Sequence, residues 1–134
     1  MSEAEQEKYA EIVRKLIEHE NTLQNYRFTW FSASQALLLA ALGVSWEKAL
    51  FVACTICLVG VITSLTAFIA LRLCDLAYVQ LSNWWNEHLR GYTGPPKQGF
   101  EGNYQWWMMP SKLLPWVFMF LWVALAVYRV AWYE

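Results

Sequence analysis

Residues 49–71 read ALFVACTICLVGVITSLTAFIAL and contain no charged side chain. In an α-helix, which rises about 1.5 Å per residue, a run of this length extends about 35 Å. The hydrocarbon core of a bilayer is about 30 Å thick, so one such helix crosses it with some tilt. The sequence therefore predicts a transmembrane helix here, and the rest of the chain is interpreted from it.

Two further apolar runs predict two more transmembrane helices. Residues 113–133 carry one charge, Arg129, near their end, and they have tryptophan near both ends, as is typical of membrane interfaces. Residues 28–44 form a shorter run that also lacks charge. The predicted fold class is an all-α integral membrane protein with three transmembrane helices, helical extensions on the cytoplasmic side, and assembly into a homo-oligomeric bundle or ring.

Composition supports a membrane protein and argues against catalysis. Of 134 residues, 57% are hydrophobic and 16% are charged, against roughly 45–50% and 25% in soluble domains. The net charge of -1 gives no basic field for nucleic acid. The sequence lacks a phosphate loop, a paired-carboxylate site, a nucleophile with its base and a metal-ligand set. We expect neither an enzyme nor a cofactor or metal.

Basic residues predict the orientation of the chain in its membrane. A link of six residues, 43–48, makes the first two spans an antiparallel hairpin, in which Gly43 is expected to end one helix and Ser45 to cap the next. Eight of the ten Lys and Arg side chains fall before the first span or between the second and third, and only Lys48 and Arg129 fall elsewhere. The positive-inside rule then predicts a cytoplasmic N-terminus and an external C-terminus.

Four regions follow from these patterns: a cytoplasmic amphipathic helix (1–27), a transmembrane hairpin (28–71), a cytoplasmic helix with a loop rich in Gly, Pro and aromatic residues (72–112), and a third transmembrane helix (113–134). The first region carries one apolar stripe with alternating spacings of three and four, which is typical of a helix that packs along one side. Its members are Tyr9, Ile12, Leu16, His19, Leu23, Tyr26 and Trp30. We expect the two cytoplasmic helices to lie side by side.

Small residues recur along the second span at helical spacing. Such a seam lets helix backbones approach closely in lipid, so we expect it to pack helices and to favour self-association into about four or more copies. Cys54 and Cys57 also match a redox Cys-x-x-Cys pattern, but nothing in mid-span lowers a thiol pKa, and packing is the better interpretation. The seam consists of Ala53, Cys57, Gly60, Ser64 and Ala67.

A polar strip on the first span is the candidate pore surface. A buried polar side chain in lipid either bonds another helix or faces water, and both interpretations of Gln35 remain open. In the pore interpretation, apolar side chains beyond the strip close the pathway by dewetting, and the Trp- and Phe-rich third span forms the outer wall. The pore-lining candidates are Thr29, Ser32, Gln35, Leu38 and Leu42.

Two groups of residues on the cytoplasmic side are further candidates. Aromatic and basic side chains at Trp84, Trp85, His88 and Arg90 either bind a nucleotide-like ligand by stacking or form a subunit contact. Arg14 and His19 have the spacing of HEPN ribonucleases, but on one helix they face different directions and would need a dimer. His19 is more simply a polar member of the apolar stripe, and Arg72 and Asp75 are expected to pair.

The segments EHENTLQNYRFTW (18–30) and SQALLL (34–39) resemble a pattern in small membrane proteins of bacterial antiviral operons, such as CBASS-like and Hailong-like effectors. This resemblance implies an oligomeric effector that forms an ion channel or pore, controlled by a nucleotide or short nucleic acid from a partner enzyme. The alternative is a non-conducting membrane adaptor that recruits a soluble partner. A HEPN-like ribonuclease is the third and weakest candidate.

Overall fold

The computed structural model describes residues 3–47, 49–89 and 110–132, which form three α-helices. Helix α1 spans Glu3–Ser45, α2 spans Leu50–His88 and α3 spans Pro110–Ala131. All three are long and apolar enough to cross a membrane. The all-helical class and the three candidate spans are thus confirmed for this part of the chain. Arg90 and the Gly- and Pro-rich loop lie outside the described residues.

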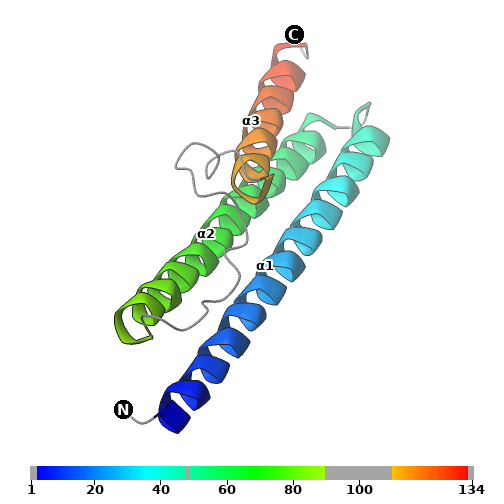
Figure 1. The fold of residues 1–134 in the computed structure, drawn as a ribbon. Coiled ribbons are helices and arrows are strands. Elements are labelled where there is room, and N and C mark those ends of the chain that lie inside the picture. Colours follow the sequence, from blue (N-terminus) through cyan, green and yellow to red (C-terminus); the bar gives the residue numbers. More distant parts are fainter. Residues whose placement is uncertain (1–2, 48, 90–109, 133–134) are drawn as a thin grey trace.

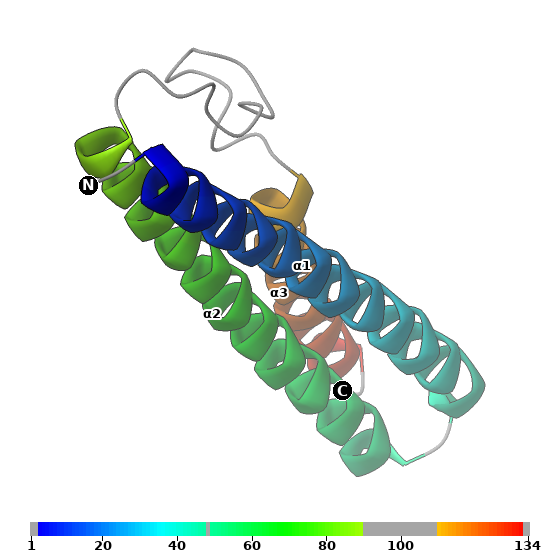
Figure 2. The same cartoon turned by 60° about the horizontal axis from the view of Figure 1, so that its bottom comes forward.

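The helices form an antiparallel hairpin with a third helix along half of it (Figures 1 and 2). Helix α2 runs back along α1, and α3 packs on the first half of α2, with its C-terminal end near the α1–α2 link. Most of the contacts of α3 are with α2. Among the described residues, one end of the molecule is therefore three helices thick and the other end two.

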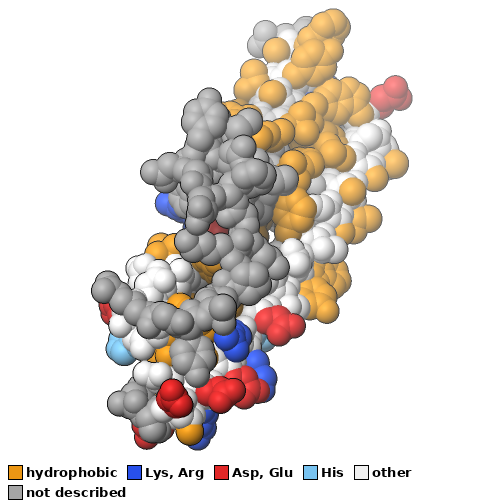
Figure 3. Space-filling model, viewed as in Figure 1, with side chains coloured by type: hydrophobic (Ala, Val, Ile, Leu, Met, Phe, Trp, Pro, Cys, Tyr) orange, Lys and Arg blue, Asp and Glu red, His pale blue; other side chains and the backbone are white. Residues whose placement is uncertain are grey.

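Helices α1 and α2 are each about twice as long as a span requires, because roughly 20 residues cross a bilayer. The part that α3 does not cover, residues 3–27 and 72–89, is called the distal hairpin below. Charged side chains gather on it, whereas apolar side chains dominate the other end on the face drawn in Figure 3. Such a density of charged side chains is costly to place in lipid.

Each end of the molecule has its own hydrophobic core. The distal core consists of Ala10, Val13, Ile17, Trp85 and Leu89. The core at the three-helix end consists of Leu42, Ala53, Cys57 and Trp122, with Leu38, Phe118 and others against it. The distal hairpin is therefore a packed pair in its own right.

The apolar stripe predicted for residues 9–30 is not the face that α1 buries against α2. The buried positions, Ala10, Val13 and Ile17, lie one residue further along than Tyr9, Ile12 and Leu16. One residue turns a helix by about 100°, so the two faces are distinct. Residues 3–27 and 72–89 lie side by side as expected, but mainly through this second face.

The link between α1 and α2 also differs from expectation. Helix α1 continues through Gly43 and ends at Ser45, and Ala49, without a side-chain hydrogen bond, precedes α2. Backbone groups near lipid need internal partners, which favours continuing the helix past a glycine. Gly43 therefore does not end α1, and Ser45 does not cap α2.

Candidate functional site

A buried polar junction joins the three helices at the three-helix end. Gln35 of α1 is fully buried, as is Trp122 of α3. The Gln35 amide donates from Nε2 to Thr63 Oγ1 of α2 at 3.0 Å and accepts at Oε1 from Trp122 Nε1 at 2.6 Å. One amide thus bonds both other helices, which satisfies polar groups that would be costly to leave unpaired in lipid.

A glycine makes room for the tryptophan of this junction. A Cβ built on Gly60 would overlap the Trp122 indole ring. Ser64, one turn further along α2, is buried and donates to the Gly60 carbonyl at 2.8 Å. Trp122 is the largest fully buried side chain among the described residues. Helix α3 therefore docks on α2 through Trp122 and Gly60. It is not only an outer helix that faces lipid, as the sequence suggested.

The small-residue seam of α2 serves this docking within one chain. Ala53, Cys57, Gly60 and Ser64 are buried, and Ala67 is half-buried. The cluster around Trp122 includes Ala53 and Cys57. The expectation that the seam joins separate copies is revised, because α3 of the same chain occupies it. The three cysteines are free thiols.

The five pore-lining candidates do not form one surface. Gln35 and Leu42 are buried inside the protomer, Leu38 and Ser32 are half-buried, and Thr29 is exposed. A step of three residues turns a helix about 60° short of a full circle, so this strip spirals from the outer face to the inner one. For Gln35 and Leu42 the pore position is therefore corrected, and Gln35 instead makes the helix-to-helix contact that was its alternative.

Removing both partners of the junction should cost less stability than the sum of the two single losses. We expect Trp122→Phe, and separately Gln35→Leu, to lower the free energy of unfolding by about 1–3 kcal/mol, because each leaves a buried polar atom unpaired. The double variant should show a coupling energy of about 0.6–1.7 kcal/mol. SDS titration in mild detergent micelles, followed by tryptophan fluorescence, measures all three; strictly additive losses would contradict the junction.

Two polar contacts lie where α3 begins and the distal hairpin leaves it. Arg27 of α1 donates from Nη1 to the Ala70 carbonyl at 3.0 Å and to Cys74 Sγ at 2.8 Å. Lys112 of α3 forms an ion pair of 3.2 Å with Asp75 of α2, and both side chains are largely buried. The Asp75–Lys112 pair was not predicted, since no sequence pattern links residues so far apart; Asp75 was expected to pair with Arg72.

The aromatic candidates on α2 are used for packing. Trp85 is buried in the distal core, with the Arg14 guanidinium 5.4 Å from its ring centroid. Trp84 stacks on His88 at 4.6 Å and lies 6.3 Å from the ring of Tyr9. His88 also bonds the Trp84 carbonyl through Nδ1 at 3.0 Å. These contacts are made within the chain, whereas the sequence left open a ligand site or a subunit contact; Arg90 lies outside the described residues.

The ribonuclease candidate receives no support from this arrangement. Arg14 lies over Trp85, and the His19 side chain is exposed on another face of the helix. Within the described ranges, no group of three His, Cys, Asp or Glu side chains is placed to hold a metal ion.

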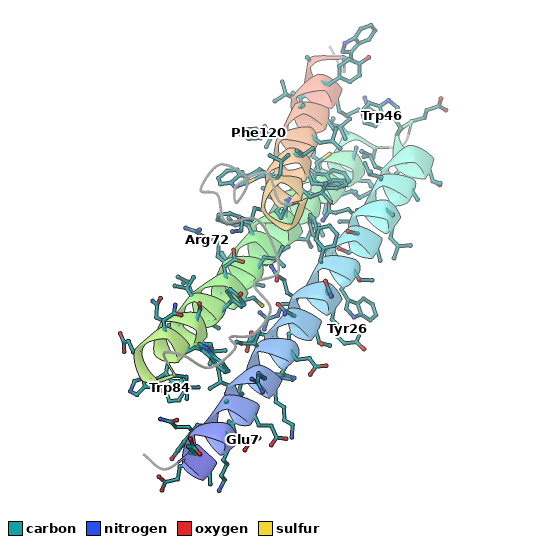
Figure 4. All side chains as sticks on the ribbon, viewed as in Figure 1. Glu7, Tyr26, Trp46, Arg72, Trp84 and Phe120 are labelled. Carbon is teal, nitrogen blue, oxygen red and sulfur yellow. The ribbon has the colours of Figure 1, made fainter. Side chains whose placement is uncertain are left out.

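An aromatic cavity near the α1–α2 link was not anticipated. It has a volume of about 260 Å³ and is lined by Trp46, Glu47, Tyr128, Arg129 and Trp132. Figure 4 shows Trp46 beside the α1–α2 link. Its ring stacks with that of Tyr128 at 6.1 Å, and the Arg129 guanidinium lies 5.7 Å from its centroid. Arg129 thus makes a cation–π contact with Trp46 near the α1–α2 link.

No protein family matches this chain, and searches of curated proteins and of solved structures find no match either.

Proposed function

We propose that the chain is a membrane-anchored adaptor. In this proposal the three-helix end crosses the bacterial inner membrane, and the distal hairpin contacts a soluble partner on the cytoplasmic side. The observation that carries the proposal is the distal core of Ala10, Val13, Ile17, Trp85 and Leu89. A helix pair that only crossed a membrane would need no second core in water.

The distribution of Lys and Arg supports the orientation, because Lys8, Arg14, Lys15 and Arg27 all lie in the distal part of α1. The position of Gln35, the central residue of the polar strip, supports an adaptor over a channel. Gln35 bonds Thr63 and Trp122 in the same chain, so it offers no free amide to water or ions.

An ion-conducting assembly is the second candidate, and one observation favours it. Thr29, Ala33, Ala36 and Ala40 share one exposed face of α1, on which small and hydroxyl side chains leave room for water between copies. Any such pathway would run between copies and not through a protomer. For either function, the resemblance to antiviral effectors supports a role in bacterial defence, controlled by a nucleotide or short nucleic acid.

Two measurements on the full chain separate these functions. The adaptor should give no unitary currents in planar bilayers, and in its host it should retain a soluble protein at the membrane. We expect Trp85→Ala, which removes the centre of the distal core, to release that protein while the chain stays in the membrane. Phe120→Ala, on the exposed face of α3, is the control and should change neither. Unitary currents from the unmodified chain, with no protein released by Trp85→Ala, would instead favour the channel.

A further inference from the structure

The apolar stripe on α1 continues through the whole helix with a strict heptad spacing. After Trp30 the same alternation of three and four reaches Ala33, Leu37, Ala40 and Val44. The stripe therefore covers five heptads, from Tyr9 to Val44. A repeat of 3.5 residues kept over this length is the pattern of a helix that supercoils with another helix.

This seam is largely uncovered within the described residues, although the Tyr9 ring at its start lies 6.3 Å from that of Trp84. Ile12 and Leu16 are 44% and 45% exposed, and Trp30, Leu37 and Val44 are more than 70% exposed. Figure 4 shows Tyr26, which belongs to the seam, pointing away from α2. The contacts of α1 with α2 use the neighbouring face that contains Ala10, Val13 and Ile17.

Neither lipid nor a soluble protein can cover the whole seam. Lipid can cover Trp30 to Val44, but Ile12 and Leu16 lie about 24 and 18 Å before the first span, at about 1.5 Å per residue. A soluble protein can reach Ile12 and Leu16 but not the part inside the bilayer. A single occupant of the whole seam is a helix that crosses the membrane and continues beyond it, as α1 of a second copy does.

Charges beside the seam are compatible with copies of α1 lying parallel and in register. With Tyr9 and Leu16 at position a, Lys15 is at g and Glu20 is at the following e. In a parallel coiled coil these two positions meet across the interface, so Lys15 of one copy approaches Glu20 of the other. Lys15 already bonds Glu11 at 2.8 Å, and an ammonium group has hydrogens for both.

We propose that copies of this chain assemble through this seam into a parallel, in-register α1 bundle that begins in the distal hairpin and continues through the membrane. The proposal goes beyond the adaptor function and does not depend on it. It also accounts for the exposed His19, which occupies position d as a polar side chain that sets register.

Cross-linking tests the seam directly in native membranes. In a chain with alanine at Cys54, Cys57 and Cys74, Leu16→Cys should form disulfide-linked dimers on mild oxidation. Glu18→Cys is the matched control, because Glu18 is exposed on the opposite side of the same turn of α1. We expect Leu16→Cys to cross-link more than tenfold faster than the control. Equal rates at the two positions, or no dimer at either, would overturn the proposal.

A second test keeps all native cysteines and does not rely on oxidation. Leu16→Lys and Leu16→Glu each place like charges in the seam, so each purified protein should have the mass of one chain in mild detergent. Expressed together, the two should assemble again, since opposite charges now meet. Retention of the unmodified mass by both single variants would mean that the seam does not carry the assembly, and would overturn the proposal. A monomeric unmodified chain would overturn it as well.

Discussion

Gly60→Leu is expected to detach α3 from the hairpin. The Trp122 ring occupies the space where the new side chain must go, and both lie in a packed core. Overpacking of this kind costs up to about 3 kcal/mol, and more where neither side can shift. SDS titration followed by tryptophan fluorescence should show a loss of roughly 3 kcal/mol in the free energy of unfolding.

The rate at which Cys57 is alkylated gives an independent measure of whether Gly60→Leu detaches α3. Cys57 is buried beside Trp122. In a chain with alanine at the other two cysteines, Gly60→Leu should speed alkylation of Cys57 more than about tenfold, because each 1.4 kcal/mol changes a population tenfold. Gly43→Leu is the control, since nothing lies within 4 Å of a Cβ at that position. Similar behaviour of the two variants would contradict the docking of Trp122 on Gly60.

Trp85→Ala should open the distal hairpin and leave the membrane-spanning part folded. Trp85 is 4% exposed and is the largest side chain of a small core. Truncating a buried tryptophan to alanine costs about 3–5 kcal/mol. Hydrogen exchange measured by mass spectrometry should therefore lose protection in residues 3–20 and 76–88, while residues 50–65 keep theirs.

The neighbouring residue provides the matched control. Trp84 is half-buried and packs on His88 and Tyr9 at the margin of the distal core. Trp84→Ala should leave most of the protection in place. If the two alanine variants lost protection equally, the distal core would not depend on Trp85 as described.

Hydrophobic patterning was sufficient to predict the three helices but not which face of α1 packs within the chain. An uncharged run such as 49–71 has one stable outcome, a helix across lipid. In α1, however, two apolar faces lie about 100° apart, one through Ile12 and Leu16 and one through Val13 and Ile17. Periodicity favours the first face as the packing face, because its apolar residues are more regularly spaced. Only the position of α2 shows that the second is the internal one.

The polar junction was predictable in part. That Gln35 needs a partner follows from the cost of a bare amide in lipid. That Gly60 lies in a packing seam follows from its spacing with Cys57 and Ser64. Trp122 could not be found in this way, because a tryptophan in an apolar helix has the composition of a lipid-facing side chain. Its role depends on the rotation of α3, which tertiary packing sets.

The change from three helices to two, between the covered part of α2 and the distal hairpin, has a mechanical consequence. A bundle of three packed helices resists bending more than a pair does. A force applied at the tip of the distal hairpin therefore produces its largest bending moment at the boundary where the three-helix part begins. Arg27 and the Asp75–Lys112 ion pair lie at that edge and join α1 to α2 and α2 to α3. A torque applied at the tip of the distal hairpin would therefore strain these polar contacts before it strains the apolar core around Trp122.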